Sequence, residues 1–538
     1  RWWVRSAETE EGEEQMAREQ DQQELAYAHH LALAHESVLT EASLAFPSPG
    51  EYMVDLTCQS SQGETVQLLG EELRCMYVRR EMRTLTPSDR RKFLEAIRTL
   101  IDVPTSEGRV MYGRNYHDLN YYAARHTSLA GARNADHVHD GLGFITQHLS
   151  LTNDFELSLQ FVDPSITVPY WDYTRDMSMV KAKYGLDDAS MIIKDSEIYS
   201  SEWFGSTDDK SHAIKDGIFA YIQVETNVTT GTSSPYGYLR APWNLNPSPY
   251  VTRYHTFCGA RPSSEFQWPT CASHLEAVQY TSWYDFSWDS SYTPHGPVHA
   301  WSGGVGGRCD DIDRVLLPLF EASENSDYDL FKNYLFILLK NAWREFAIQP
   351  PKYCSVDAID DCVNKCDSGS FATANLKSLT GTYLADKGNL NLTGSDLALV
   401  TRTLNCRFAY WPGDQLEAAS PADPIFWPIH PTMERLIHLK NIARPFTDKT
   451  WVTTSHDDDS YKLCARDGLV ACKGHNPYDQ THWPLISRRS SNAPYEVNTV
   501  TNMEVRRAMD MDAYALPYIY DNFHWDHCEE EGVHFPTI

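Results

Sequence analysis

The chain has 538 residues, of which 42% are hydrophobic and 12% aromatic, which is enough apolar material for a buried core and too much for a disordered protein. Lys and Arg number 46 against 74 Asp and Glu, so the net charge of −28 disfavours a nucleic acid or an anionic membrane as partner. No run of 18 apolar residues is present, and the start of the chain lacks the apolar stretch of a signal peptide. We therefore expect a soluble globular protein with one dominant core.

Residues 1–50 are predicted to form an exposed N-terminal helical arm. Residues 6 to about 45 are rich in Glu, Gln and Ala and contain no Pro or Gly between Glu13 and Phe46, a composition that favours a solvated helix. Residues 51–538 are expected to form the main domain. Three histidines of the arm are interpreted as exposed residues rather than metal ligands: His29, His30 and His35.

Three later stretches carry the signals of amphipathic helices. The first begins at Thr86, which can cap a helix, and Pro87, which suits the first helical position, and apolar residues then recur on one face. A helical pattern also covers Tyr112 to about Arg175, and another covers about Tyr328 to Phe346. These patterns predict a mainly α fold with long loops.

Twelve cysteines indicate an oxidising compartment. Their number is even, and they lack the repeated Cys-x-x-Cys spacing of a zinc site, so we predict that all of them form disulfides in a secreted protein. Short separations favour the pairs Cys258–Cys271 and Cys464–Cys472, and the connectivity is otherwise open.

Two sequons for N-linked glycosylation fit the same compartment. They place candidate glycans at Asn227 and Asn391. Asn391 falls within a segment of about residues 310–420 that holds several of the cysteines. We interpret this segment as a disulfide-pinned insertion at the surface.

Two histidines stand four residues apart, a spacing that can hold a metal ion. On a helix, His295 and His299 lie one above the other on the same face. Pro294 and Pro297 are compatible with the first turn of that helix, whose amides have no internal partner. Surface histidines also meet this spacing by chance, so the assignment depends on further histidines.

Four more histidines strengthen the interpretation as a metal site. His139 and His148 are separated by a loop that enters a helix, and His126 continues an apolar stripe and therefore faces the core. A core histidine more often satisfies a hydrogen bond than binds a metal, so His126 would not be assigned alone. His430 follows a rigid turn of Pro and aromatic residues.

In chain order, these residues resemble the motifs of the tyrosinase and molluscan haemocyanin family. The pattern His-x8-His-x7-Glu begins at His139, Pro-Tyr-Trp-Asp occupies residues 169–172, and His-x3-His begins at His295. Asp-Pro-x-Phe-x3-His begins at Asp423, and residues 518–521 are similar to the tyrosine motif that closes the family's core. The resemblance runs from about residue 75 to residue 521.

The resemblance implies a four-helix bundle that holds two copper ions with dioxygen between them. Imidazole suits copper in both oxidation states, and three neutral ligands leave each ion an open position. By motif, the first copper would be bound by His126, His139 and His148 and the second by His295, His299 and His430. His117 is the alternative to His126.

The implied activity is oxidation of o-diphenols (catechols) to o-quinones by dioxygen, with a small phenol as the partner molecule. Two alternatives stay open: a structural or assembly-forming extracellular glycoprotein that retains the fold, and an oxygen carrier. A carrier would normally contain tandem copies of the unit, and the sequence holds no second copy. Whether the protein forms a homo-oligomer is also open.

The chain departs from its family around the expected ligands. Many relatives have a Cys two residues before the second ligand, bonded to that imidazole, whereas this chain has His137. Relatives that hydroxylate monophenols often have Asn where this chain has Gly296, and many have a second histidine at the place of Ile429. A glycine cannot fix a water that takes the proton of a phenol, so both positions predict a preference for o-diphenols.

Overall fold

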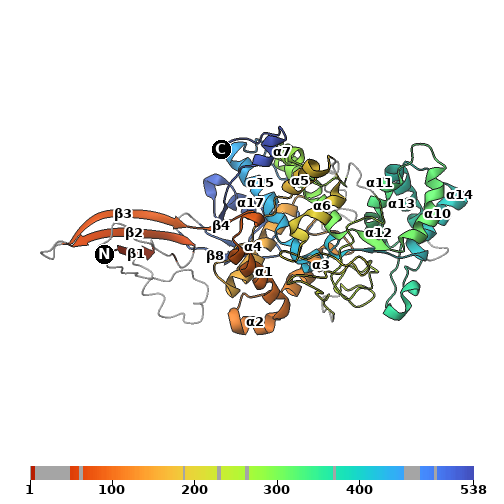
Figure 1. Cartoon of the computed structure of the whole chain (residues 1–538), viewed down its shortest axis with the longest axis horizontal. Coiled ribbons are helices and arrows are strands. Elements are labelled where there is room, and N and C mark those ends of the chain that lie inside the picture. The colour runs from red at the N-terminus through yellow and green to blue at the C-terminus, as the bar shows by residue number, and fades with distance from the viewer. Residues whose placement is uncertain are drawn as a thin grey trace.

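The computed structural model describes residues 2–6, 46, 49–59, 65–185, 188–226, 232–260, 266–366, 371–452, 473–489 and 493–538. In these parts of the chain helices predominate, and strands form one three-stranded sheet and three short pairs (Figure 1). The predicted mainly α fold is confirmed. The helices are α1 (Pro87–Asp102), α2 (Thr105–Tyr112), α3 (Leu119–Ala130), α4 (Phe144–Val162), α5 (Thr174–Tyr184), α6 (Ala189–Asp195), α7 (Cys271–Gln279), α8 (Trp283–Tyr292), α9 (Gly296–Gly303), α10 (Cys309–Glu321), α11 (Tyr328–Asn333), α12 (Leu335–Arg344), α13 (Phe371–Gly388), α14 (Gly394–Arg402), α15 (Ile429–Ala443), α17 (Asn502–Ala508) and α18 (Asp526–Glu530).

The strands add one projecting sheet and three short pairs to this helical body. The antiparallel sheet β1 (Trp2–Ser6), β2 (Gly50–Gln59) and β3 (Thr65–Cys75) projects from one end, at the left of Figure 1. The arm predicted over residues 1–50 therefore begins with a strand. Its expected helix lies outside the described residues. One short pair is parallel and consists of β4 (Tyr77–Arg79) and β9 (Tyr518–Tyr520). Two short pairs are antiparallel: β5 (Val305–Gly307) with β6 (Tyr410–Pro412), and β7 (Leu485–Ser487) with β8 (Glu496–Asn498).

Local sequence signals account for the helices on the outside of the core. In α1 the side chain of Thr86 accepts a hydrogen bond from the amide of Asp89, and Pro87 occupies the first position, as predicted. The helix predicted from about Tyr328 to Phe346 is present as α11 and α12. The pattern over residues 112–175 resolves into α3, α4 and the start of α5, with loops between them.

The core lies around two helices that are buried on all sides. Every residue of α4 from Phe144 to Gln160 is buried, and so is every residue of α15 from Ile429 to Lys440. The two helices pack against each other, and α1 packs against α4. A helix buried all round belongs in the centre of a domain, so these two helices form its middle layer.

Helices α10 to α14 gather at the end of the molecule opposite the projecting sheet (Figure 1). They belong to the segment between His299 and His430. Two disulfides lie within this segment, Cys354–Cys362 and Cys366–Cys406, and a third, Cys258–Cys309, joins its start to the preceding loop.

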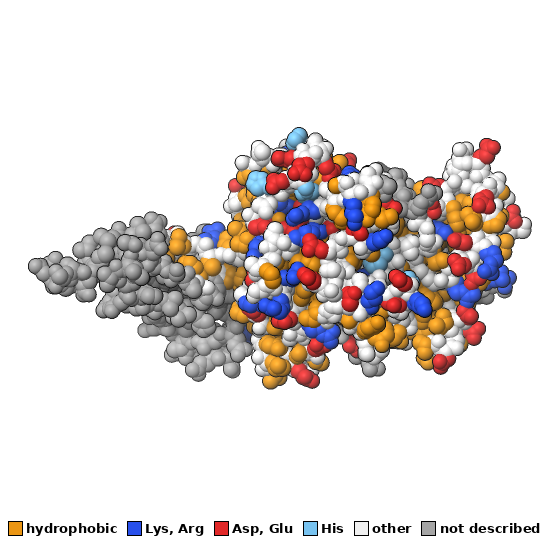
Figure 2. Space-filling view, in the orientation of Figure 1, with side chains coloured by type: hydrophobic (Ala, Val, Ile, Leu, Met, Phe, Trp, Pro, Cys, Tyr) orange, Lys and Arg blue, Asp and Glu red, His pale blue; other side chains and the backbone are white. Residues whose placement is uncertain are grey.

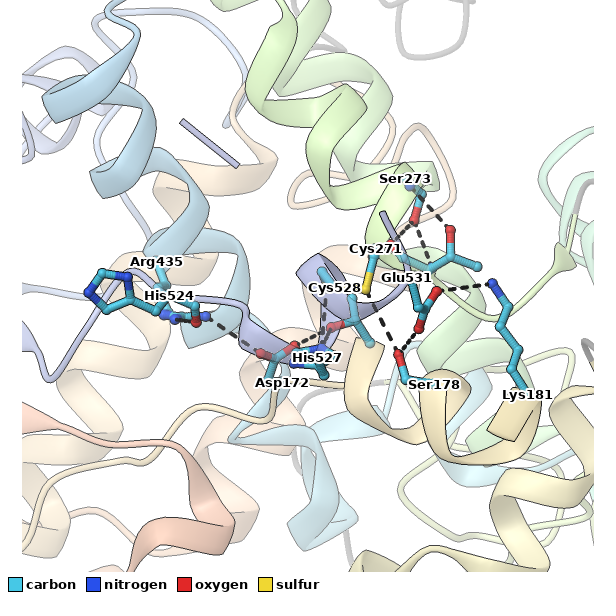
Figure 3. The surroundings of a disulfide bond; sticks show 12 residues. Asp172, Ser178, Lys181, Cys271, Ser273, Arg435, His524, His527, Cys528 and Glu531 are labelled. Carbon is cyan, nitrogen blue, oxygen red and sulfur yellow. Dashed lines mark hydrogen bonds and ion pairs between the residues drawn. A yellow bond between two sulfur atoms is a disulfide. The ribbon is translucent and has the colours of Figure 1, made fainter. Parts of the chain in front are cut away.

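A fourth disulfide, Cys271–Cys528, joins α7 to α18 near the C-terminus. Figure 3 shows Glu531 beside this bond, where it meets Ser178 and Lys181 of α5. The predicted pair Cys258–Cys271 is therefore wrong, because each sulfur finds a partner much further along the chain.

Other cysteine and surface predictions have mixed outcomes. Cys464 and Cys472 lie outside the described residues, and Cys75 forms no disulfide within the described part. Asn391 is exposed, whereas Asn227 lies outside the described residues. None of the described helices has the length and apolar character needed to cross a membrane. On the face shown in Figure 2, acidic and basic side chains are interspersed over the helical body.

Candidate metal centre

The structure brings six of the histidines together as two groups of three. One group contains His126 from α3, His139 from the loop after it and His148 from α4. The other contains His295, which precedes α9, His299 of α9 and His430 of α15. Within each group the nitrogen atoms that could bind a metal all lie within 4.8 Å of one another.

The two groups adjoin each other. The ring of His148 in the first group stacks on that of His430 in the second, with centroids 4.4 Å apart, and the rings of His148 and His295 lie 6.3 Å apart. Within the second group, the Nε2 atoms of His295 and His430 are 3.0 Å apart. Two phenylalanines flank the histidines: the ring of Phe144 lies 4.6 Å from those of His148 and His295, and the ring of Phe426 lies 4.5 Å from that of His430. The six imidazoles therefore form one compact cluster with an apolar surround.

Backbone carbonyls orient four of the six imidazoles through their Nδ1 atoms. Because a carbonyl can only accept, each of these Nδ1 atoms carries the proton and the Nε2 atom carries the lone pair. The pairs are His126 with Ala418 O at 2.7 Å, His148 with Phe144 O at 2.8 Å, His295 with Ser291 O at 3.0 Å and His299 with Gln415 O at 3.2 Å.

The arrangement fits a bound metal. The Nε2 atoms of His126, His148 and His299 are buried and have no hydrogen-bond partner, and the Nε2 atom of His430 faces that of His295. Leaving a buried polar atom without a partner is unfavourable, and a metal ion would supply one. Three neutral imidazoles for each ion is a donor set that suits copper. The residues present therefore fit the two copper ions that the motifs imply.

Burial keeps five of the six imidazoles neutral: those of His126, His148, His295, His299 and His430. Burial lowers the pKa of His126 and of His295 to about 3, and it holds the pKa values of His148, His299 and His430 well below the usual value for histidine. A metal ligand must be deprotonated, so these five imidazoles can bind an ion without first releasing protons.

His139 differs from the other five because its Nδ1 atom faces a carboxylate. It lies 3.1 Å from Oδ1 of Asp136, which is 3% exposed. Burial alone would raise the pKa of Asp136, but the neighbouring His139 and Lys340 hold it well below the usual range. The side chain of His139 is 28% exposed, so this side of the cluster faces solvent.

His475 braces the loop that carries His139, a role that the sequence did not predict. Its Nε2 atom donates to the carbonyl of Asp136 at 2.9 Å, and its Nδ1 atom accepts from the amide of Gly143 at 3.1 Å. A side chain at Gly141 would collide with this ring, since a Cβ atom there would lie 2.5 Å from it. Glycine is therefore needed where the loop crosses His475.

A second brace holds the segment that carries the carbonyls of Gln415 and Ala418. The Arg240 guanidinium bonds both carboxylate oxygens of Asp414 at 2.6 and 2.9 Å, and both side chains are buried. Nearby, Arg253 bonds Asp423 in the same bidentate way at 2.6 and 2.7 Å. Neither arginine stands in a motif, so sequence reasoning missed both.

A buried network links the two central helices. Arg79 bonds Glu156 of α4 at 3.0 Å and Glu434 of α15 at 2.8 Å. Glu434 also accepts from the hydroxyls of Tyr518 and Tyr520. Glu434, four residues after His430, therefore contacts Arg79 and two tyrosines of this network rather than one of the six histidines.

The remaining predicted positions lie as follows. His117 stacks on Tyr121 with centroids 3.8 Å apart and lies outside both groups of three. Gly296 is the first residue of α9, and Ile429 is fully buried at the start of α15. Each directly adjoins one of the six histidines in the chain.

One further group of possible metal ligands occurs among the described residues: Cys271, His527 and Cys528. The two sulfur atoms form a disulfide, and Nε2 of His527 lies 2.8 Å from the hydroxyl of Thr174 (Figure 3 shows the disulfide and His527). In this state the group has no free thiolate to offer to a metal.

Comparison with known proteins adds to this geometry. Residues 113–313 match the family model "Common central domain of tyrosinase". A solved structure of a mutant polyphenol oxidase from Thermothelomyces thermophila is similar at 11% sequence identity, with a TM-score of 0.39. The match covers 83% of this chain and 89% of the polyphenol oxidase chain. The comparison with curated proteins found no match. The matched segment of the family model contains five of the six clustered histidines and ends before His430.

Proposed function

We propose that the chain, whose residues 113–313 match the family model of the tyrosinase central domain, is a copper-dependent oxidase that converts o-diphenols to o-quinones with dioxygen. The observation that carries the proposal is the pair of histidine groups with buried, unpartnered ring nitrogens. Two copper ions bound there would accept electrons from the catechol and pass them to dioxygen. In the overall reaction, two catechols and one dioxygen become two o-quinones and two waters.

The residues around the cluster would control orientation and access. Carbonyls hold four imidazoles with their lone pairs directed at the cluster, so little reorganisation is needed when an ion binds. The rings of Phe144 and Phe426 would keep water from the buried side. A phenol would approach from the side of His139, the partly exposed member of its group.

Two positions support a preference for o-diphenols over monophenols. Gly296 has no side chain that could hold a proton-accepting water, and the fully buried Ile429 is apolar. A phenol has a pKa of about 10 and must lose its proton before it binds a metal. Without an ordered water to accept that proton, monophenols should be slowed most.

Initial rates on a catechol and on the matching monophenol, with copper content verified, test this function. We expect a measurable rate on the catechol and a much lower rate on the monophenol. The variant Gly296→Asn should raise the monophenol rate relative to the catechol rate. A Cβ atom at this position would lie 3.3 Å from the carbonyl of Ser291, so the backbone needs to shift only slightly.

Equal rates on the two substrates would refute the preference. No rate on either substrate at full copper loading would refute the oxidase and leave oxygen carriage or a structural role.

A secreted, glycosylated form is part of the same proposal. The four disulfides among the described residues support an oxidising compartment, and the exposed Asn391 is open to a glycan. Mass spectrometry of the protein from its natural source would identify the glycan. An unmodified Asn391 together with reduced cysteines would contradict this part of the proposal.

A further inference from the structure

Among the six clustered histidines, only His139 has a carboxylate at its Nδ1 atom. Oδ1 of Asp136 lies 3.1 Å from that nitrogen and also accepts from the backbone amides of Val138 and His139, at 3.2 and 2.8 Å. One oxygen atom therefore holds both the backbone and the ring of His139. The other five imidazoles have a neutral carbonyl at Nδ1 or, in His430, no partner.

The second oxygen of the same carboxylate faces two cations. Oδ2 of Asp136 lies 3.3 Å from Nζ of Lys340 and 3.5 Å from Nη2 of Arg344. Both cations also face Asp140, at 3.1 and 3.7 Å, so two acids and two bases form one neutral cluster. A buried carboxylate needs such partners, because an unpaired charge in the interior is strongly unfavourable.

Both cations come from one helix of the segment between His299 and His430. They occupy positions 340 and 344 of α12, four residues apart and hence on one face. Arg344 also donates to the carbonyl of Ala130, at the end of α3, at 2.7 Å. This contact anchors α12 next to the loop that carries His139.

We propose that Asp136, held by Lys340 and Arg344 of α12, is the positioning residue of His139 at the candidate copper centre. This inference rests on the proposed function. A carboxylate that accepts the Nδ1 proton fixes the ring and makes the opposite nitrogen a stronger donor to a metal. The loop thereby gains a restraint at a ligand whose neighbourhood offers no Cys for a covalent one, since position 137 is a histidine.

The proposal assigns a function to the long segment between His299 and His430. Its helix α12 supplies the positive charges that allow a carboxylate to stay ionised beside a metal ligand. Loss of either cation should therefore weaken the metal site, although neither side chain touches one of the six histidines.

Copper titration against a competing chelator tests the proposal on the full chain. Asp136→Asn keeps an oxygen for the backbone amides and removes the charge, so the loop should fold while one of the two copper ions binds about 10–100-fold more weakly. Lys340→Met should weaken the same ion by a smaller factor. The matched control is Asp140→Asn. The side chain of Asp140 faces the same two cations but makes no hydrogen bond to the ring of His139, so this variant should bind both ions as tightly as the wild type.

A measurement on metal-free protein separates positioning from a merely structural role. In protein labelled with ¹⁵N at histidine, NMR should show the Nδ1–H tautomer at His139, with the signal assigned through His139→Gln. Asp136→Ala should lose this tautomer preference, whereas Asp140→Asn should retain it. A merely structural role for Asp136 would lower the melting temperature without changing the tautomer.

The outcomes distinguish this proposal from the proposed function. Wild-type protein that fails to bind two copper ions would overturn the function and the positioning role together. Wild-type protein that binds two ions, with Asp136→Asn binding them equally tightly, would overturn the positioning role alone.

Discussion

The Nδ1 atom of His126 donates to the backbone carbonyl of Ala418, 2.7 Å away, although 292 positions separate the two residues. Three residues before Ala418, the carbonyl of Gln415 accepts a hydrogen bond from Nδ1 of His299 at 3.2 Å. One short segment thus orients an imidazole from each histidine group. Its own position depends on the buried ion pair between Arg240 and Asp414, so changes there should reach the centre.

Breaking that ion pair should be strongly destabilising. Arg240→Met leaves the buried carboxylate of Asp414 without its cation, and such a loss amounts to about 3–5 kcal/mol in the free energy of unfolding. Urea denaturation of the metal-free protein measures it. The control is Arg314→Met, which removes an exposed ion pair with Asp311 and should change stability by about 0–1 kcal/mol. Similar losses in both variants would argue against the role of Arg240.

Copper content should follow membership of the two histidine groups. His148→Ala and His299→Ala should each lose one of two copper ions, because two imidazoles bind copper with lower affinity and poorer geometry. His117→Ala should keep both ions, since His117 lies outside the groups. Elemental analysis after dialysis gives the counts. Loss of an ion in His117→Ala, with both retained in His126→Ala, would reverse the assignment of the first ligand.

Glu417 should make stability fall as the pH rises. Burial, and then the neighbouring Asp414, raise the pKa of Glu417 to about 8, above the ordinary value of 4.5. The folded state thus holds a proton that the unfolded state releases. The contribution of this proton to the free energy of unfolding is complete below pH 4.5 and declines by about 1.4 kcal/mol per pH unit up to about pH 8.

Thermal unfolding of the wild type and of Glu417→Gln over about pH 5–9 measures this contribution. A glutamine can still accept from the amide of Ala241, which lies 3.2 Å from both carboxylate oxygens. The variant should show a flatter pH profile and should gain stability over the wild type at the alkaline end. Parallel profiles for the two proteins would show that Glu417 is already ionised at neutral pH.

Removing the Cys271–Cys528 disulfide should release the C-terminal segment. Replacing both cysteines by Ser opens a cross-link between residues 257 positions apart, and losses of about 2–5 kcal/mol are typical of native disulfides. The control is the Cys354–Cys362 pair, whose separation of 8 predicts a smaller loss. Limited proteolysis near α18, together with urea denaturation, reports the effect. Equal losses for the two pairs would contradict the argument from loop length.

Much of the candidate centre was predictable from short stretches of sequence. The His-x3-His spacing at His295 and the apolar stripe ending at His126 each depend on helical periodicity over a few residues. The cap at Thr86 is equally local, because a side-chain oxygen meets an amide three residues ahead. These signals predicted the mainly α fold, and the resemblance to the family motifs indicated the six histidines that the structure brings together.

The supports of the centre were not predictable in this way. The pairs Arg240–Asp414 and Lys340–Asp136 join residues 174 and 204 positions apart, and no periodicity links their members. The same reason explains the error over Cys258, whose true partner is Cys309. The sequence by itself therefore determined the helices, because helical hydrogen bonds join residues four positions apart. It also determined the spacings of the histidines along these helices. Only the tertiary structure decided which charges and sulfurs meet, because those pairs form after distant segments have packed around α4 and α15.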